Sequence, residues 1–266
     1  MALGFALAVL AITFVSSALF WAKVWWFPVD ISLHGLAIDR QFTVTFVVCG
    51  VIFVMAQVGL AWFVWRYRDR GDNRKTIYSH GNNKLEATWT IAAAIVFIGL
   101  NLMGYHVWAE IHLTGPAPGA LPIEVTGQQF QWSFRYPGKD GVFGPTHVEL
   151  VDDAGGNTLG LDRTHDAASK DDIVTATLAL PVNRSIQLLL RSKDVTHSFF
   201  VRELRLKQDT VPGMVIPLHF VATRVGRYEL ACAELCGLGH YKMRAFVEVM
   251  TEDDFQKWLQ KMASEQ

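Results

Sequence analysis

The chain has 266 residues and a formal net charge of -1, and 51% of its residues are hydrophobic. Because the net charge is close to zero, no basic face would release counterions from phosphates, which argues against nucleic acid as a partner. The hydrophobic residues are concentrated in the N-terminal part, so we expect membrane lipid and other proteins as partners.

Residues 1–27 open with an uncharged stretch that is either a secretory signal or a membrane-spanning helix. No Lys or Arg precedes its apolar part, and no small-x-small cleavage site precedes the tryptophans near its end. Lys23 and those tryptophans, Trp21, Trp25 and Trp26, are typical of an anchor at the membrane interface. We predict a retained helix.

Two further uncharged runs, residues 42–65 and 87–108, predict a transmembrane hairpin over residues 39–110. Each run exceeds the roughly 20 residues that an α-helix needs to cross the hydrocarbon core. The loop between them, 66–85, carries only two acids, Asp69 and Asp72, against six basic residues: Arg66, Arg68, Arg70, Arg74, Lys75 and Lys84. The positive-inside rule therefore predicts that this loop is cytoplasmic and that the chain after the hairpin is periplasmic.

Residues 120–250 follow a Gly/Pro-rich linker and show the alternation of apolar and polar residues that is typical of strands. The pattern is clearest in residues 123–134, 185–201 and 219–230. Several short strands without intervening helices predict an antiparallel sandwich or barrel.

Two other segments belong to this C-terminal part. Residues 137–172 are rich in Gly and Asp, so we interpret them as an excursion from the β core that forms a solvated surface loop; a docking surface for a basic partner is the alternative. Residues 251–266 predict a helix, because Thr251 with Asp254 is a typical start and an apolar face follows.

The segment with the clearest chemistry is residues 232–243, which read CAELCGLGHYKM. Cys232, Cys236, His240 and Met243 place two thiols, an imidazole and a thioether in one loop between two predicted strands. Soft sulfur with imidazole selects copper or zinc, and Met is a weak ligand typical of copper electron-transfer sites. His197, at a predicted strand end, is the best placed second histidine.

Two other interpretations of these residues remain open from the sequence. Two nearby cysteines outside the cytoplasm often form a disulfide, and two Cys with two His can bind structural zinc, although zinc would leave Met243 unexplained. A mononuclear copper site needs only one thiolate. Two Cys, two His and one Met therefore favour a dinuclear copper centre that carries one electron at a time.

These residues closely resemble the CuA motif of subunit II of the haem-copper cytochrome c oxidases, C-x-E-x-C-G-x-x-H-x-x-M with an upstream D-V-x-H-S. The upstream residues 194–198 read DVTHS here, residues 207–213 read KQDTVPG, and residues 85–90 read LEATWT at the start of the last membrane run. The resemblance covers most of residues 39–250. It implies a membrane α-helical anchor followed by an all-β, cupredoxin-like Greek-key barrel.

The resemblance also implies the metal ligands. Cys232 and Cys236 would bridge two copper ions, with His197 and Met243 on one ion. His240 and the backbone carbonyl of Glu234 would complete the other. In the family the side chain of that glutamate reaches a magnesium site shared with subunit I.

Four more positions take expectations from the family. Phe130 stands where many members have the tryptophan that receives the electron from cytochrome c, and the neighbouring Trp132 is retained. Asp194 would lie beside the copper site, although a turn cap is an equal alternative. Glu86 matches a carboxylate at the cytoplasmic mouth of a proton channel, although a helix-terminal charge explains it as well.

The function implied is that of the electron-accepting subunit of a cytochrome c oxidase in a bacterial inner membrane. It would take electrons from a periplasmic c-type cytochrome or similar donor and pass them to haem in subunit I, coupled to O2 reduction and proton pumping. The alternatives are the copper subunit of a nitric oxide reductase, a copper-free structural subunit of a quinol oxidase, and a copper chaperone or sensor. Whether residues 1–27 are cleaved is left open.

Overall fold

The structure, a computed structural model, describes residues 1–71, 75, 77–78 and 80–265. Asp72 and Arg74 of the predicted cytoplasmic loop lie outside the described residues. The chain forms two compact units. One consists of Met1–Phe27 with Ala37–Val107, and the other of Pro28–Leu36 with Trp108–Gln266.

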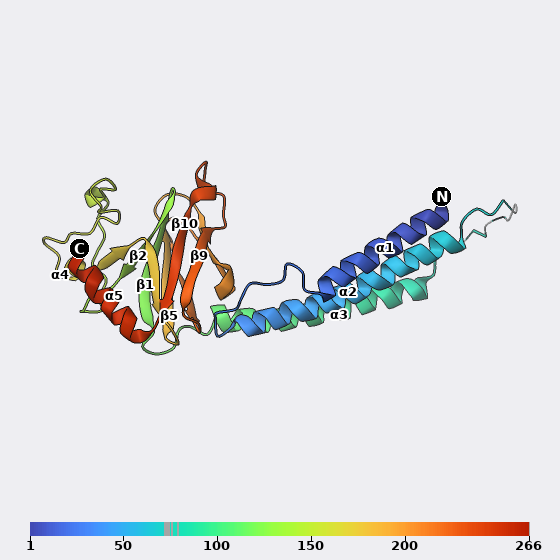
Figure 1. Cartoon of the computed structure of the whole chain (residues 1–266), viewed down its shortest axis with the longest axis horizontal. Helices are drawn as coiled ribbons and strands as arrows, with labels where there is room; N and C mark the ends of the chain where they lie inside the picture. The colour runs from blue at the N-terminus through green and yellow to red at the C-terminus, as the bar shows by residue number, and fades with distance from the viewer. Residues whose placement is uncertain (72–74, 76, 79, 266) are drawn as a thin grey trace. The chain divides into compact units, whose positions relative to one another are not determined.

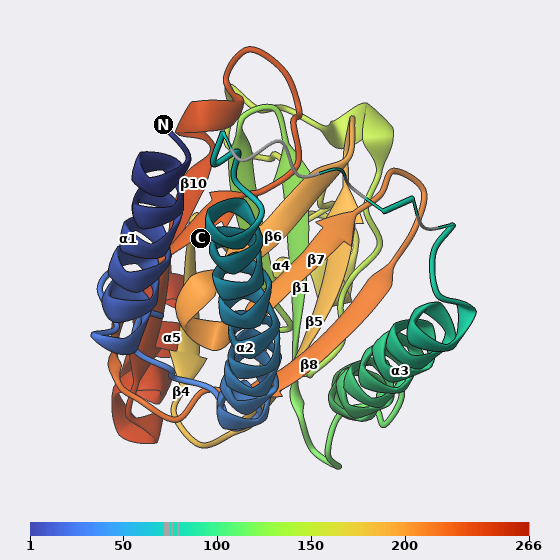
Figure 2. The same cartoon turned by 90° about the vertical axis from the view of Figure 1, so that its right-hand side faces the viewer.

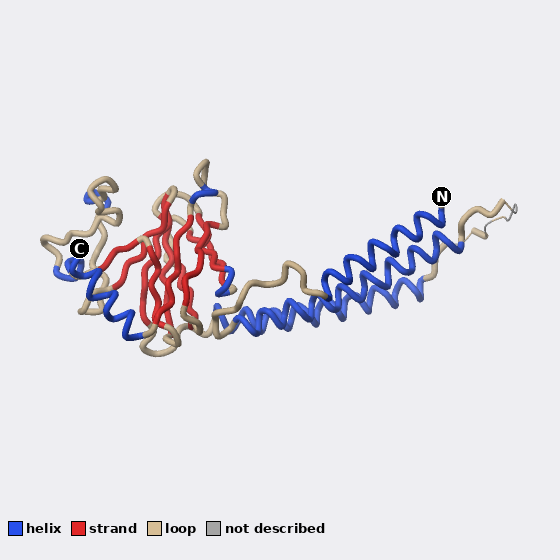
Figure 3. The backbone as a smooth tube through the Cα atoms, in the orientation of Figure 1, coloured by secondary structure: helices blue, strands red, loops and turns tan. Residues whose placement is uncertain are grey.

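The first unit is helical (Figures 1 and 3). Among the described residues, three helices are long and apolar enough to cross a membrane: α1 (Ala2–Trp21), α2 (Gly35–Arg66) and α3 (Asn83–His112). Most of their apolar side chains are exposed in the isolated chain, as expected for surfaces that face lipid. These helices indicate a membrane anchor.

Local side chains satisfy the backbone where the helices need it. Thr13 donates its hydroxyl to the Val9 carbonyl at 2.8 Å, so this polar group does not face lipid unpaired. The Asn82 side chain caps α3 by accepting from the Lys84 and Leu85 amides at 3.1 and 3.2 Å. The polar groups at these two points, inside α1 and at the start of α3, are therefore paired.

Aromatic side chains join the end of α1 and the chain after it to α2. The Phe20 ring lies 5.2 Å from Trp26 and 5.7 Å from Phe46, and Phe27 lies 5.9 Å from Phe42, centroid to centroid. Such offset and edge contacts are favourable between aromatic rings. Residues 20–27 are therefore part of the helical unit rather than a free tail.

The second unit contains two five-stranded sheets (Figures 1 and 2). The first sheet has the order β3 (Ile173–Thr175), β2 (Gln131–Tyr136), β1 (Leu121–Gln128), β5 (Ser185–Ser192), β8 (Ile216–Val221). The second has the order β4 (Thr177–Pro181), β10 (Arg244–Met250), β9 (Gly226–Cys232), β6 (His197–Val201), β7 (Leu206–Thr210). The predicted all-β class is confirmed, and each of the three alternating stretches contains two strands joined by a turn.

The sheets are mixed rather than wholly antiparallel as predicted. β1 pairs with β5 in parallel, and β4 pairs with β10 in parallel. The second pairing has a simple cause: only Ala176 separates β3 from β4, yet the two strands belong to different sheets. The chain therefore crosses between the sheets at this point and runs alongside β10 in the same direction.

The core lies between the sheets and is built by alternation along the strands. In β5, Ile186, Leu188 and Leu190 are fully buried, whereas the residues between them are half-buried on the other face. The helix α5 (Glu252–Glu265) adds a second apolar contact. Its Phe255 is fully buried, and its Trp258 meets Tyr136 edge-on at 5.2 Å.

The segment Pro28–Leu36, which leads into the first residues of α2, packs on the β unit. Ile31 is fully buried, its amide donates to the Glu203 carbonyl at 3.0 Å, and its carbonyl accepts from the Thr223 amide at 2.8 Å. The Leu33 amide donates to Val221 at 3.0 Å. No local pattern indicated this attachment, because it depends on pairing over a long sequence separation.

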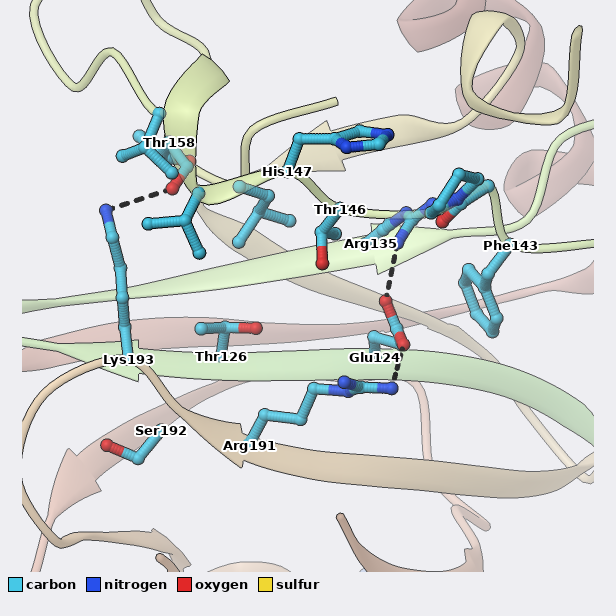
Figure 4. Close-up of a pocket in the computed structure, with 15 residues that line it drawn as sticks. Glu124, Thr126, Arg135, Phe143, Thr146, His147, Thr158, Arg191, Ser192 and Lys193 are labelled. Atoms are coloured by element: carbon cyan, nitrogen blue, oxygen red, sulfur yellow. Dashed lines mark hydrogen bonds and ion pairs between the residues drawn. The ribbon is translucent and has the colours of Figure 1, made fainter. Parts of the chain in front are cut away.

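Residues 137–172 connect β2 to β3 and include a short 3-10 helix, Val148–Leu150, and the four-residue helix α4 (Ala167–Lys170). Their base is fastened by Arg135, which is 1% exposed. Its guanidinium pairs with Asp172. Figure 4 shows its second pairing, with Glu124 at 2.9 Å. A cavity of about 470 Å³ lies between this segment and the sheet. A buried ion pair therefore fastens one end of the segment to the sheet, while many of the segment's other acids are exposed.

Candidate metal centre

The loop between β9 and β10 is held at both ends. The Cys232 amide donates to the Met243 carbonyl at 3.0 Å, which closes the loop. The next amide, that of Ala233, donates to the Ser198 carbonyl at 3.0 Å and fastens the loop to β6. His240 begins a single 3-10 turn that leads into Met243. The four side chains predicted to bind metal are therefore presented by a short loop with fixed ends.

The donor atoms of these side chains converge. The two thiol sulfurs lie 3.9 Å apart and are not bonded to each other. Cys236 Sγ lies 3.6 Å from His240 Nδ1 and 3.8 Å from Met243 Sδ. Cys232 Sγ lies 3.2 Å from the carbonyl oxygen of Glu234. The predicted ligands of the loop thus gather around the two sulfurs.

His197 brings the second imidazole from another strand. It begins β6 and is fully buried, with Nδ1 4.0 Å from Cys232 Sγ. Ligand atoms of His197, Cys232 and Cys236 all lie within 4.8 Å of one another. Because this sequence of contacts joins β6 to the β9–β10 loop, neighbouring strands of one sheet hold the whole donor set.

Asp194 orients the ring of His197. Its Oδ1 lies 2.8 Å from His197 Nε2, and a carboxylate can only accept there, so Nε2 carries the proton. The lone pair of Nδ1 is then directed toward Cys232 and is free to bind a metal ion. Asp194 Oδ1 also accepts from the Val195 amide at 2.7 Å, so it is a turn cap as well. The carboxylate therefore contacts both a predicted ligand and the backbone of its own turn.

The Cys236 thiol lies in an environment that favours its neutral form. Burial, and then the nearby thiol of Cys232, raise the pKa of Cys236 to about 11. Two thiolates this close would repel each other in a buried site unless cations compensated their charge. A set of two thiols, two imidazoles, a thioether and a carbonyl fits soft metal ions, and copper uses this combination.

Phe130 covers the other side of the loop. Its ring lies against the backbone of two glycines, and a Cβ at Gly239 would be 2.4 Å from Phe130 Cδ2. Phe130 remains 38% exposed, whereas Trp132 is buried and meets His197 edge-on at 6.0 Å. The adjacent Gln129 donates its side-chain amide to the Cys236 carbonyl at 2.6 Å.

Sequence reasoning did not single out Gln129. The only signal was its place beside Phe130 in an otherwise alternating stretch, and its contact with Cys236 joins segments that are far apart in the chain. The side chain of Glu234 is exposed on the loop. Glu86 is exposed in the first turn of α3 and belongs to the helical unit.

Comparisons with known proteins agree on one family. The sequence profile described as "Cytochrome C oxidase subunit II, periplasmic domain" matches residues 121–250. The chain is 37% identical to the alternative cytochrome c oxidase subunit 2 of Bradyrhizobium diazoefficiens, over 98% of this chain and 91% of that protein. It is 31% identical to cytochrome c oxidase subunit 2 of Thermostichus vulcanus, over 87% of this chain and 76% of that protein.

One solved structure is similar to part of this chain. It is the crystal structure of the periplasmic domain of subunit II of a cytochrome oxidase from Bradyrhizobium japonicum, with 28% sequence identity and a TM-score of 0.41. The match covers 56% of this chain and 97% of that structure.

Proposed function

The chain belongs to the cytochrome c oxidase subunit II family, and we propose that it accepts electrons from a periplasmic cytochrome c at a dinuclear copper centre. It passes them to haem in subunit I of a complex in a bacterial inner membrane, where O2 is reduced and protons are pumped. The observation that carries this proposal is the convergence of six soft or carbonyl donors on one buried spot.

We assign the donors as the family resemblance implies. Cys232 and Cys236 would hold both copper ions, with His197 and Met243 as further ligands of one ion and His240 and the Glu234 carbonyl as further ligands of the other. A centre of this kind supplies one-electron transfer with little movement of its ligands, because bridging thiolates spread the charge over two metal ions.

The surrounding residues hold the donors still and keep water out. Met243 and both cysteines are buried, and His197 is fully buried between Trp132 and Asp194. A ligand set that is already in place needs little rearrangement when the charge of the site changes. This rigidity favours rapid electron transfer over substrate chemistry.

Electrons reach the site through the Phe130 side of the loop in this proposal. Phe130 is partly exposed and contacts the loop backbone at Gly239, so a docked cytochrome would meet its ring before the ligands. Trp132 lies behind it beside His197. We therefore assign electron uptake to Phe130, with Trp132 next to the ligand.

Two carboxylates extend the proposal to the partner subunit. The exposed side chain of Glu234 is free to bind a magnesium ion shared with subunit I. Glu86, in the first turn of α3, is the candidate for proton uptake from the cytoplasm. We expect Glu86→Gln to slow oxidase turnover while the copper spectrum stays the same, and unchanged turnover would remove Glu86 from this role.

Electron paramagnetic resonance of the copper-loaded protein is the direct test. One unpaired electron shared equally by two copper nuclei gives a multiline hyperfine pattern that zinc, a disulfide or a single copper ion cannot produce. His197→Asn and Cys236→Ser should each abolish this pattern and electron uptake while the protein still assembles in the membrane. Intact turnover with quinol by a complex that has no copper in this chain would instead support the copper-free structural role.

Gas uptake separates the two possible acceptors. The purified complex should consume O2 when it is supplied with reduced cytochrome c. Consumption of NO without O2 would assign the chain to a nitric oxide reductase, with the same copper site.

A further inference from the structure

Lys193, in the loop between β5 and β6, joins the segment 137–172 to the sheet. Its Nζ donates to Gln128 Oε1 at 3.0 Å, to Asp153 Oδ1 at 2.9 Å and to the Thr158 carbonyl at 3.0 Å. Figure 4 shows the side chain extending from the strand end to Thr158. An ammonium group has three donors, so all of them have acceptors here.

The acceptors on the segment side are themselves fixed. The Asn157 side chain donates to the Leu150 and Leu161 carbonyls at 3.0 Å and accepts from the Leu161 amide at 2.8 Å. Asp153 and Thr158 flank this pinned turn. Gln128 also donates to Asp153 at 3.4 Å, which closes a triangle with Lys193. Lys193 is therefore held by an organised turn rather than by a loose surface acid.

Lys193 and its acceptor on the sheet side, Gln128, are each followed in the chain by a residue that contacts a predicted metal ligand. Asp194 follows Lys193 in the chain, and it accepts from His197 Nε2 at 2.8 Å and from the Gln129 amide at 2.7 Å. Gln129 follows Gln128, and its side chain donates to the Cys236 carbonyl at 2.6 Å. Two short routes thus lead from Lys193 to candidate ligands.

We propose that Lys193 is a positioning residue that fixes the 137–172 segment to the turn beside the metal centre. Through Asp194 it sets the orientation of His197, and through Gln128 and Gln129 it sets the loop at Cys236. The proposal rests on the proposed copper function. The contacts of Lys193 themselves do not depend on copper. It gives the acid-rich segment a role in the geometry of the site, in addition to any role in docking.

The half-exposed ion pair itself contributes little to the stability of the fold, because solvent screens it. Loss of the ammonium should therefore loosen the turn without unfolding the domain. Lys193→Met removes all three donors and keeps the apolar stem. Lys193→Arg keeps the charge, but its planar fork matches three convergent acceptors poorly, so we expect partial rescue. Lys257→Met, which alters a Lys–Asp pair on α5, is the matched control.

The first measurement needs no copper. Backbone hydrogen exchange is followed in the copper-free full-length protein at the Gln129 and Val195 amides, which both donate to Asp194. We expect Lys193→Met to accelerate both by roughly tenfold, the factor for the loss of one hydrogen bond to a charged group. Asp194→Ala shows the upper limit, and Lys257→Met should match the wild type. Exchange in the core strands should not change.

The second measurement uses the copper-loaded protein. Lys193→Met should alter the hyperfine splitting and shift the reduction potential, with Lys193→Arg between it and the wild type. If exchange at Gln129 and Val195 and the spectrum are both unchanged in Lys193→Met, the positioning role is wrong even though the copper function stands. If the wild type shows no shared-electron spectrum while exchange responds as expected, the copper function fails and the mechanical connection remains.

Discussion

At the scale of single residues, Asp194 is the side chain on which the geometry of the metal centre depends most directly. Its two oxygens accept from the His197 ring and from the Val195 and Gln129 amides. One carboxylate therefore fixes a ligand, its own turn and the turn that carries Phe130. A neutral amide in this place cannot satisfy all three donors, because one of its two terminal atoms donates.

We expect Asp194→Asn to weaken copper binding by roughly 10- to 100-fold, the usual effect of losing a hydrogen bond that orients a metal-binding histidine. Titration of the copper-loaded protein with a chelator measures this change. Asp253→Asn, on the exposed start of α5, is the control and should leave the titration unchanged. Equal copper retention in both variants would mean that Asp194 only caps its turn.

Phe130 offers a test of the electron route. We expect Phe130→Trp to speed the reduction of the copper centre by cytochrome c, because a larger π-system would extend the partly exposed ring toward a docked donor. Stopped-flow mixing of reduced cytochrome c with the oxidised protein measures the rate. A spectrum identical to that of the wild type must accompany the change, so that the ligands are known to be undisturbed. An unchanged rate would show that the donor docks elsewhere.

Single-residue reasoning from the sequence was strongest where the chemistry is local. Cys232, Cys236, His240 and Met243 stand close together in the chain, so their spacing alone indicated a metal loop. The supporting contacts could not be predicted in this way. Lys193 contacts the 137–172 segment. Lysine is common on protein surfaces, so its presence at this position does not predict a contact.

At the scale of elements, the strand pattern was least successful in predicting the burial of the polar face of the first sheet. Arg135 occupies a polar position of β2, which strand alternation predicts to face water. Instead the 137–172 segment covers it, and its guanidinium lies between Glu124 and Asp172. Alternation shows which side of a strand faces the core, but it cannot show that a later segment buries the other side.

We expect Arg135→Met to lower the free energy of unfolding by ~3–5 kcal/mol near neutral pH, because the fully buried Asp172 loses its cation and Glu124 keeps only the half-exposed Arg191 at 3.0 Å. Denaturant unfolding of the copper-free protein measures this. Arg184→Met removes an exposed guanidinium paired with Glu252 and should change the free energy of unfolding by less than ~1 kcal/mol. Equal changes in the free energy of unfolding would show that the buried ion pair stabilises the fold no more than the exposed one.

The same variant should depend on pH. Burial already raises the pKa of Asp172 in the wild-type protein, and loss of Arg135 would raise it further. An acid whose pKa is raised by folding favours the folded state while it is protonated, and that contribution is lost as the pH rises through the raised value. The stability gap between Arg135→Met and the wild type should therefore narrow in mildly acidic solution and widen toward neutral pH.

At the scale of the whole molecule, the fold class was predictable because two unrelated patterns agreed, and the family was predictable from the resemblance of residues 194–198 and 232–243 to its motif. Long uncharged runs predicted spanning helices, and alternation with turn residues predicted the β unit; both are confirmed. The attachment of residues 28–36 to the β unit was missed, because Ile31 pairs with residues near 203 and 223. Pairing at that separation leaves no local pattern.

The orientation of the chain in the membrane remains a prediction that follows from charge. The loop 66–85 is rich in Lys and Arg, so it should remain on the cytoplasmic side while the β unit is periplasmic. Single cysteines at Tyr78, in the loop, and at Lys139, in the β unit, report the two sides, since both positions are exposed. The background carries Cys49→Ser, because Cys49 is exposed on α2.

With a membrane-impermeant maleimide on intact spheroplasts, we expect Lys139→Cys to be labelled and Tyr78→Cys to be labelled only after the membrane is opened. Peptide mapping by mass spectrometry assigns each label and separates it from any reaction at Cys232 or Cys236. The same maps show whether peptides from residues 1–27 are present, as the aromatic contacts of Phe20 and Trp26 with Phe46 lead us to expect. Labelling of Tyr78→Cys in intact cells would place the β unit in the cytoplasm, where it could not accept electrons from a periplasmic cytochrome.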